Sequence, residues 1–488
     1  MSLEISYWAV IPEIVLSLAG IVIMLLAPIV EPESRGRLGY LAFIGTVLAG
    51  AATAPLWNKS MVAFNGMITV DNYGTFLRLI FILIAALSIL LSVHFNRREE
   101  INHGEYFALI LFATAGMSLM AAGTDLIIIF LGLEILSIAT YVLAGFKRSD
   151  VKSNESSLKY FLLGSFSTAF LLYGIAFAYG ATGSTNLQNI RQALGAATQG
   201  TRLLGPQTNT LLLLSLALLI AGFGFKVATV PFHIWTPDVY EGAPTPVTTF
   251  MAVGPKAAGF AAFLRLLLTA MPAYHWYWAG ILWILAALTM TLGNVVALVQ
   301  PNLKRMLAYS SIAHAGYILI GMAAGRELNA SPILFYILAY TLMSVGAFAV
   351  VLTVSGKGDL RVNLDDYAGL GFQQPVLSFA LSLCLLSLAG IPLTAGFMGK
   401  FYLFTTAVQA GYVGLVIIAA LNSVVSVFYY VRPVIYMFMR ESTSPAPEIS
   451  VPVPVIITLI ITTIGTLWLG IFPAGFIQLA KESLLALK

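Results

Sequence analysis

The sequence has little charge and almost no cysteine. Of its 488 residues only 9% are charged, against about 25% in a typical soluble domain. Hydrophobic residues make up 59% of the chain, and the mean hydropathy is +0.91. A single cysteine, Cys384, excludes a disulfide framework and a cysteine-ligated iron–sulfur cluster in this chain. These absences indicate a polytopic membrane protein that carries no redox centre of its own.

Motifs for other common chemistries are also missing. No group of His, Asp and Glu has the spacing of metal ligands, and no Gly-rich phosphate loop or nucleophile elbow occurs. The few charges are scattered over connections, which argues against nucleic-acid binding. The N-terminal segment carries Glu4, Pro12 and Glu13 instead of the basic start and cleavage site of a signal peptide. We interpret it as the first membrane span and expect this chain to bind no cofactor and no metal.

Windows of about 20 apolar residues recur along the chain, separated by polar or Gly/Pro-rich connections. They predict an all-α polytopic fold with about 14 transmembrane helices. The predicted spans are 8–30, 38–57, 74–94, 105–122, 125–146, 157–181, 209–241, 246–271, 277–299, 303–324, 331–355, 375–408, 412–439 and 451–478. The seventh is too long for a simple crossing and contains Pro231 and Pro237; the twelfth contains Gly390, Pro392 and Gly396. Both are predicted to be discontinuous helices.

The two broken spans lie five positions apart in the order of spans, which predicts two structural repeats. An odd number of spans per repeat makes the copies inverted in the membrane, and transporters commonly place broken helices at an ion site near the midplane. The predicted organisation is 1–104 for spans 1–3, 105–271 for the first repeat, 272–440 for the second, inverted repeat, and 441–488 for span 14.

Lysine and arginine are distributed unequally over the alternate connections. Twelve of them fall on one side of the membrane and six on the other. The positive-inside rule places the more basic side in the cytoplasm. Both termini are then predicted to lie on the external, periplasmic side of a bacterial cytoplasmic membrane.

Seven cationic residues fall within or at the edge of apolar spans: Arg78, Lys159, Lys226, Lys256, Arg265, Lys400 and Arg432. A lysine at the bilayer centre costs roughly 2.5–3.5 kcal/mol, so such residues should face a partner or a hydrated cavity. Glu134, near the middle of span 5, is the natural partner for Lys226 in span 7. Because desolvation favours a neutral lysine and a nearby carboxylate favours the charged form, this pair is predicted to be a switchable proton site. A static ion pair is the structural alternative.

Further titratable residues extend this site. His233 and His314 titrate in a range that suits a relay between lysines, although a single histidine in an apolar helix is often only a packed core residue. Lys256 follows a Gly-Pro step, where freed backbone groups and water can gather. Lys400 lies deep in span 12, eight residues beyond Pro392.

Residues near the predicted span ends have two interpretations. Lys159 and Lys304 open spans 6 and 10, and each is either a relay residue or an anchor at the membrane surface. Asp238 and Glu241 are expected to end the broken helix near the cytoplasmic boundary. The serine pair Ser310–Ser311 is expected to pack, although hydroxyls can also hold water.

The segment 232–260 reads FHIWTPDVYEGAPTPVTTFMAVGPKAAGF. It resembles the antiporter-like proton-pumping subunits of NADH-quinone oxidoreductase (respiratory complex I) and of the multisubunit cation/proton antiporters, most closely the subunit N group. The resemblance extends over essentially the whole chain, and it implies the same inverted repeats and discontinuous helices 7 and 12 that the span pattern predicts. A lysine at 400, where the sister subunit M has glutamate, and the short segment after span 14 both favour subunit N.

The resemblance also implies roles for individual residues. The family's proton-relay positions on helices 5, 7, 8 and 12 fall on Glu134, Lys226, Lys256 and Lys400. Secondary positions of the relay fall on Lys159, His233 and Lys304, and His314 is the further candidate.

The function implied is that of a membrane-arm subunit of a proton-translocating enzyme, driven by NADH-to-quinone electron transfer elsewhere. FMN, iron–sulfur clusters and the quinone site are implied for partner subunits, which include sister antiporter-like subunits. A Mrp-type sodium/proton antiporter subunit is the alternative, but sodium prefers several oxygen ligands and Glu134 alone offers few. The series of buried lysines argues against a third possibility, a non-conducting scaffold. The lipid bilayer and protons are the remaining expected partners.

Overall fold

The computed structural model describes residues 6–198, 206–325, 331–441 and 449–484. Nearly all of these residues are helical. The helices are α1 (Ile11–Leu26), α2 (Arg37–Thr53), α3 (Asn72–Arg98), α4 (Gly104–Ala122), α5 (Leu126–Ala144), α6 (Val151–Thr182), α7 (Leu187–Thr198), α8 (Pro206–Val227), α9 (Trp235–Gly242), α10 (Thr245–Thr269), α11 (His275–Leu298), α12 (Leu303–Ala323), α13 (Ser331–Ser355), α14 (Leu370–Gln373), α15 (Pro375–Ala389), α16 (Ala395–Gln409), α17 (Val413–Met439), α18 (Val453–Ile471) and α19 (Ala474–Leu484).

Short elements join some of the helices. One antiparallel hairpin pairs β1 (Met61–Ala63) with β2 (Ile68–Val70). The 3₁₀ helices are Tyr7–Val10, Pro32–Ser34, Ala54–Leu56, Pro272–Tyr274, Lys357–Asp359 and Leu364–Tyr367.

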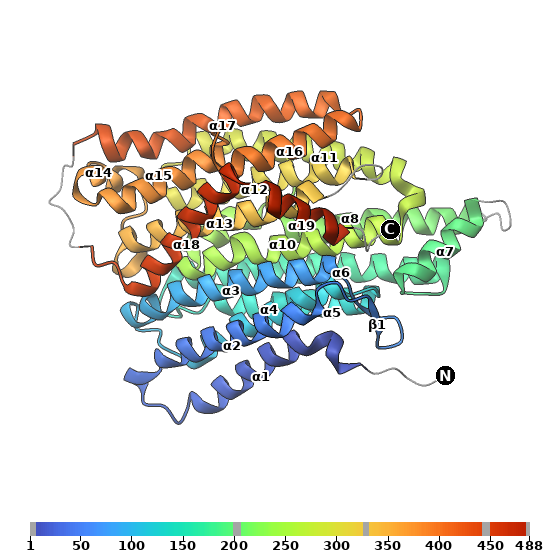
Figure 1. The fold of residues 1–488 in the computed structure, drawn as a ribbon, viewed down its shortest axis with the longest axis horizontal. Coiled ribbons are helices and arrows are strands. Elements are labelled where there is room, and N and C mark those ends of the chain that lie inside the picture. The colour runs from blue at the N-terminus through green and yellow to red at the C-terminus, as the bar shows by residue number, and fades with distance from the viewer. Residues whose placement is uncertain (1–5, 199–205, 326–330, 442–448, 485–488) are drawn as a thin grey trace.

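The predicted all-α polytopic fold is confirmed. Thirteen helices within the described residues are long and apolar enough to cross a membrane. The remaining predicted span, 375–408, is formed by α15 and α16, two helices of 15 residues placed one after the other. Neither is long enough to cross alone. Most of the long helices run side by side along the long axis of the view in Figure 1.

The bundle has two ends, which we name by their contents. The basic end carries the connections 145–150 and 356–363, with Lys147, Arg148, Lys357 and Arg361. The terminal end carries the start of α1 and the end of α19, and it lies to the right in Figure 1. The start of α1 and the end of α19 therefore lie toward the same end of the bundle, as the predicted even number of spans requires.

Both predicted helix breaks are present. α8 ends at Val227 and α9 begins at Trp235, so the break includes Pro231. α15 ends at Ala389. The next residue, Gly390, has a φ of 92°, a left-handed conformation that glycine adopts at little cost, and the chain passes Pro392 before α16 begins.

Two of the predicted helix breakers do not break a helix. Pro237 lies in the first turn of α9, where its missing N–H has no helical partner to lose. Gly396 lies in the first turn of α16, and a Cβ at this position would overlap the carbonyl oxygen of Ser387. Gly396 is therefore needed because α15 and α16 approach each other closely.

Two predicted span limits also differ from the structure. The predicted span 451–478 is two helices, since α18 ends at Ile471 and α19 begins just after Pro473. Helix α6 begins at Val151, six residues before the predicted start of span 6. Lys159 therefore lies inside α6 and not at its first turn.

The centre of the bundle is formed by α10, α12 and α13, whose apolar windows are 94–100% buried. The outer helices α1, α2, α6, α17 and α18 are only 33–39% buried over the same length. They expose large apolar side chains, as expected for a lipid-facing surface. Lys256 and Arg265 on α10 and Lys304 on α12 are therefore buried inside the bundle.

Candidate proton-relay site

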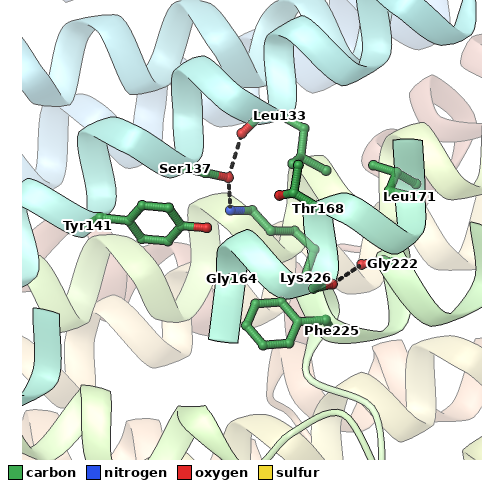
Figure 2. A pocket seen from close by; sticks show the side chains of 10 residues that line it. Leu133, Ser137, Tyr141, Gly164, Thr168, Leu171, Gly222, Phe225 and Lys226 are labelled. Carbon is green, nitrogen blue, oxygen red and sulfur yellow. Dashed lines mark hydrogen bonds between the residues drawn. The ribbon is translucent and has the colours of Figure 1, made fainter. Parts of the chain in front are cut away.

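Lys226 is buried at the end of α8, one residue before the first helix break. Its Nζ donates a hydrogen bond to Ser137 Oγ on α5 at 2.8 Å, and Ser137 Oγ donates in turn to the carbonyl of Leu133. Figure 2 shows this chain of contacts beside a small cavity between α5, α6 and α8. The cavity of about 10 Å³ is at the lower limit of what one water molecule needs.

Glu134 and Lys226 form no direct ion pair among the described contacts, so the static ion pair given as the structural alternative is not present there. Glu134 is half-buried, and its Oε1 accepts a hydrogen bond from Thr168 Oγ1 on α6 at 2.9 Å. Thr168 also lines the cavity beside Lys226, and Ser137 lies one helical turn beyond Glu134 on α5. The carboxylate and the lysine are thus connected through two hydroxyl side chains and a cavity instead of a direct contact.

Aromatic rings connect Lys226 with Lys256 across the first helix break. The Nζ atom of Lys226 lies 5.8 Å from the ring centroid of Tyr160, and that of Lys256 lies 5.7 Å from Tyr240. Trp235 lies between the two rings, stacked on Tyr160 at 4.5 Å and edge-on to Tyr240 at 6.0 Å. The ring over Lys226 belongs to α6, and the ring over Lys256 belongs to α9. Because Trp235 of α9 packs against both rings, the short helix after the break takes part in the line between the two lysines, whose ammonium groups make cation–π contacts.

Lys256 lies in the middle of α10, directly after the in-helix proline Pro255. Its Nζ donates a hydrogen bond of 2.5 Å to Ser311 Oγ on α12. A second cavity of about 10 Å³ is lined by Lys256, Ser311 and His314. The structure therefore brings Lys256 and His314 to the same small space, as a relay between them requires.

His314 is held by tyrosine hydroxyls at both ring nitrogens. Nδ1 lies 2.6 Å from the hydroxyl of Tyr336 and Nε2 lies 3.0 Å from that of Tyr430, which also hydrogen-bonds to Ser310. Hydroxyl groups both donate and accept hydrogen bonds, so either ring nitrogen can carry the proton. This arrangement distinguishes His314 from a histidine that is merely packed among apolar side chains.

Lys400 is buried in α16, just after the second helix break. Its Nζ donates to the carbonyl oxygens of Leu388 and Ala389 at 3.1 and 2.8 Å, and to Ser423 Oγ at 3.0 Å. These carbonyls belong to the last turn of α15, which the break leaves without helical partners. The negative end of the α15 dipole favours a cation at this position.

Tyr317 connects Lys400 to His314. Its ring centroid lies 4.8 Å from Lys400 Nζ and 5.7 Å from the centroid of the His314 ring. The buried groups therefore follow one another in contact from Lys226 through Lys256 and His314 to Lys400. Within the described part of the chain, none of these three lysines forms an ion pair.

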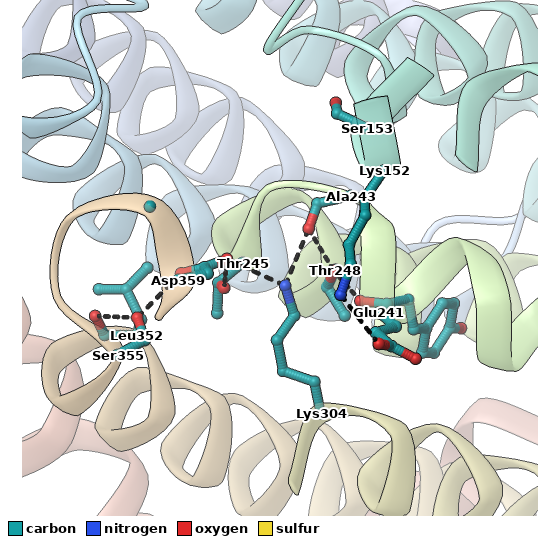
Figure 3. Close-up of polar contacts among 12 residues, drawn as sticks. Lys152, Ser153, Glu241, Ala243, Thr245, Thr248, Lys304, Leu352, Ser355 and Asp359 are labelled. Carbon is teal, nitrogen blue, oxygen red and sulfur yellow. Dashed lines mark hydrogen bonds and ion pairs between the residues drawn. The ribbon is translucent and has the colours of Figure 1, made fainter. Parts of the chain in front are cut away.

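Lys304, at the basic end, has a different environment, which Figure 3 shows. It is 2% exposed, so it cannot be an anchor at the membrane surface. Its Nζ donates to Asp359 Oδ2 and to the carbonyl of Ala243, both at 3.0 Å. Asp359 also accepts from Thr245 Oγ1 at 2.7 Å and Ser355 Oγ at 2.8 Å. Burial by itself would raise the pKa of Asp359. The charge of Lys304 and the three hydrogen bonds outweigh this effect and lower the pKa below its usual range.

Lys159 lies in a partly exposed ion-pair cluster near the same end. It contacts Glu155 and Asp238 at 2.7 Å each. Arg305 of α12 contacts Asp238 at 2.8 Å and Glu241 at 2.9 Å. The cluster joins α9 to α6 and α12. α9 stops at Gly242, so Glu241 lies in its last turn as predicted, whereas Asp238 lies in its first turn.

His233 lies in the break between α8 and α9 and not in a helix. It is half-buried, and its Nδ1 has no hydrogen-bond partner among the described residues. No hydrogen bond in that part of the chain joins its side chain to Lys226 or Lys256. The structure therefore leaves His233 beside the line of contacts described above.

The three arginines predicted within spans are held by fixed partners. Arg78 pairs with Glu13 at 2.8 Å. Arg265 makes two parallel contacts of 2.8 and 2.9 Å with Asp71. Arg432 donates to backbone carbonyls of Leu298 and Gln300. These contacts join α3 to α1, α10 to the start of α3, and α17 to the end of α11, so we assign the arginines to packing.

Several contributors to the site were not predicted from sequence. Tyr336, Tyr430, Ser137 and Ser423 carry no local signal, because hydroxyl residues are common in membrane helices. Asp359 lies 55 residues from Lys304 in a short polar connection. Asp359 comes shortly after the predicted span 331–355, and Lys304 opens the predicted span 303–324. An acidic residue and a lysine at the ends of two neighbouring spans are the signal that could have suggested this pair.

Comparison with known proteins gives the family. Residues 123–426, which include both helix breaks and the line from Glu134 to Lys400, match the family described as NADH:quinone oxidoreductase/Mrp antiporter, TM. The NADH-quinone oxidoreductase subunit N of Trichlorobacter lovleyi is 51% identical over 474 residues, which covers 97% of this chain and 96% of that protein. The chain belongs to the subunit N family of NADH-quinone oxidoreductases.

Two solved structures have a similar fold, and one of them is a chain of respiratory complex I. A chain of respiratory complex I from Thermus thermophilus, determined with bound aureothin, has a TM-score of 0.81 and 35% sequence identity, covering 97% of this chain and 100% of that one. A chain of the Mrp complex from Dietzia sp. has a TM-score of 0.85 at 20% identity over 100% of this chain and 98% of its own. The second likeness shows only that the fold is shared.

Proposed function

We propose that this chain conducts protons through the membrane as a subunit of a proton-translocating NADH-quinone oxidoreductase. The observation that carries the proposal is the continuous line of buried groups from Lys226 to Lys400, with one lysine at each helix break. Membership in the subunit N family supports the assignment to complex I. FMN, iron–sulfur clusters and quinone belong to partner subunits, and the nearest partners are other membrane-arm subunits, including sister antiporter-like subunits.

The helix breaks explain why lysines can be accommodated at these two positions. The second break leaves the last carbonyls of α15 without helical partners, and these polar groups offset part of the cost of burying an amine. Lys400 uses the carbonyls of α15 directly. Lys226 uses a hydroxyl and lies beside a cavity near the other break. Neither lysine is fixed by a carboxylate, so each can gain and lose a proton without breaking an ion pair.

Proton transfer between these groups uses hydroxyls and small polar spaces. Ser137, Ser311 and the tyrosines around His314 can each donate and accept a hydrogen bond, which a proton relay requires. Glu134 acts on this relay from one helical turn away, since its charge favours a protonated Lys226. A change in the charge or position of Glu134 then alters proton binding at Lys226.

The direction of transport follows from the charge distribution. The basic end is placed in the cytoplasm by the positive-inside rule, and the terminal end, with both termini, in the periplasm. Lys159 and Lys304 then lie on the uptake side as secondary relay residues, with His233 near the first break. Lys400, in the half-helix that runs from the second break to the terminal end, is the last lysine before release.

The arrangement of the broken helices supports two inverted repeats, 105–271 and 272–440. α8 runs from the terminal end to its break, whereas α15 runs from the basic end to its break. The two half-helices therefore approach the centre of the bundle from opposite sides. This is the geometry expected for inverted repeats that share an ion path at the midplane.

A Mrp-type sodium/proton antiporter is the second candidate because it shares the fold. Sodium binding would be favoured by several oxygen ligands around one point. Within the described residues, Lys226, Lys256 and Lys400 have hydroxyl and carbonyl partners but no carboxylate within ion-pair distance. Affinity purification of the tagged chain from its membranes tests the choice. Complex I predicts co-purifying NADH-quinone reductase activity that is coupled to proton uptake and independent of sodium; a complex without this activity contradicts it.

A further inference from the structure

An apolar cavity of about 490 Å³ lies near the terminal end, away from the lysine line. Helix α3 forms one wall with Phe76, Leu79, Ile80 and Leu83, which share one helix face by their spacing. α13 contributes Leu338 to the opposite wall. A space with this lining is unsuitable for water, which needs several polar partners.

Two short segments at the terminal end complete the cavity. Trp57 follows α2, and Phe476 and Leu479 lie on α19, which packs against α3 and α13. Ligand cavities in proteins typically measure 300–1,000 Å³ and have mostly apolar walls. The size and lining therefore fit an elongated apolar group.

The rim of the cavity is continuous with the surface that faces lipid. Leu79 is 39% exposed and Leu479 is 38% exposed, whereas Phe76, Ile80 and Leu338 are buried inside. On the adjacent helix α2, Val47 and Leu48 are also exposed. The bilayer is therefore the immediate source of an apolar occupant. From Phe76 to Leu83 the wall extends roughly 10 Å along the helix axis, which is a substantial part of one leaflet.

Residues suited to a phospholipid headgroup lie next to the same cavity. Trp57 is a residue type enriched at the membrane–water interface. Lys59 and Lys481 lie two residues beyond the lining residues Trp57 and Leu479, and both lysines are exposed. Lysines at this level attract lipid phosphate.

We propose that this cavity binds one acyl chain of a phospholipid from the leaflet at the terminal end, with the phosphate near Lys59 and Lys481. The chain fills the space between α3, α13 and α19 and so supports α19 on the bundle. The proposal is independent of the proton-relay assignment, because no residue of the lysine line contributes to the cavity.

Photolabelling of the assembled complex tests the proposal. The complex is reconstituted into vesicles of phosphatidylglycerol, with a fraction of the lipid carrying a diazirine near the end of one acyl chain. After illumination, adducts are mapped by mass spectrometry. We expect labelling of peptides that contain Leu79, Leu83 and Leu479 to exceed labelling of the open lipid face of α17, around Leu421 and Val424, several-fold. Excess unlabelled phosphatidylglycerol should remove this difference.

A substitution in the cavity is compared with the same substitution on the open lipid face of α17. Leu79→Trp fills the cavity and should reduce its labelling to the level of α17, whereas Leu421→Trp, on a 63% exposed position, should leave it unchanged. Leu79→Phe serves if the Trp variant fails to assemble. The double variant Lys59→Gln, Lys481→Gln should weaken labelling of the cavity and leave labelling of α17 unchanged.

Three outcomes would overturn the proposal. Equal labelling of the cavity and of α17 would mean that the cavity binds no lipid preferentially. Displacement of the label by decylubiquinone but not by phosphatidylglycerol would assign the cavity to a quinone. Absence of cavity labelling in the assembled complex, together with its appearance in the isolated subunit, would show that a partner helix fills the space.

Discussion

Lys226 donates its hydrogen bond to Ser137, at 2.8 Å, and not to Glu134. The lysine predicted to form a switchable proton site with Glu134 thus has a neutral acceptor, and the carboxylate is held one turn away by Thr168. A proton on Lys226 is therefore not fixed by a direct salt bridge. The charge of Glu134 acts over a short distance, which suits a site whose proton must leave in each cycle.

Ser137→Ala tests whether this hydroxyl takes part in proton transfer. The substitution removes the described hydrogen-bond acceptor of Lys226 and should lower proton pumping while the complex still assembles. Ser88→Ala is the matched control, because Ser88 Oγ is buried without a hydrogen-bond partner in the described chain. Proton uptake by vesicles containing each complex is the measurement. Equal pumping by the two variants would remove Ser137 from the relay.

The two substitutions Glu134→Gln and Glu134→Ala separate hydrogen bonding from charge. Glutamine keeps an oxygen that accepts from Thr168, so Glu134→Gln should disturb the helix contact less than Glu134→Ala. Both remove the negative charge near Lys226 and should reduce pumping. If both variants pump at the parental rate, Glu134 has no part in the mechanism.

Lys400→Arg tests the exit role of the second helix break. Moving one charge across the membrane involves about 2.3 kcal/mol per 100 mV, so an exit group must hold its proton against back-flow and still release it. A guanidinium does not deprotonate in proteins, so Lys400→Arg should assemble but pump poorly. If Lys400 only donated hydrogen bonds to the carbonyls of Leu388 and Ala389, an arginine could replace it without loss of pumping. Normal proton flux through the assembled variant would therefore contradict the exit role.

Asp359→Asn should destabilise the subunit in a pH-dependent manner. Leaving the buried Lys304 without its partner costs about 3–5 kcal/mol in comparable pairs. Because the pKa of Asp359 is lowered in the folded protein, the carboxylate stabilises the fold above its unfolded pKa of about 3.9 and loses this effect as the pH falls further. Thermal denaturation midpoints of parent and variant should differ at pH 7 and converge below about pH 4. Asp365→Asn, at a highly exposed position, is the control and should change little.

The sequence predicted the fold well because the strongest physical signals are local. Apolar windows of membrane length predicted every span, and the breaks at Pro231 and Gly390 followed from residue types that are unfavourable in a helix interior. The same reasoning failed at Pro237 and Gly396, since the effect of a proline or glycine depends on its place within a turn. The division between α18 and α19 was also missed, because the apolar pattern continues across Pro473.

The site was predicted only in part. Lysines are rare inside apolar membrane spans because burying their charge is costly. Lys226, Lys256 and Lys400 were identified for this reason. Their partners did not stand out. Ser137 lies 89 residues from Lys226, and Tyr336 lies 22 residues from His314 on another helix. Only the packing of α5 and α8 on α6, and of α12 on α13, brings these groups together.

The central claim is that Lys226 binds and releases the transported proton, and Lys226→Ala tests it most directly. The number of protons moved per NADH oxidised is measured in vesicles that contain the assembled complex. Lys357→Ala is the control, because it also removes one lysine but only breaks a surface ion pair with Glu100. We predict that the ratio falls sharply for Lys226→Ala and stays at the parental value for Lys357→Ala. A parental ratio in the assembled Lys226→Ala complex would contradict the proposed relay.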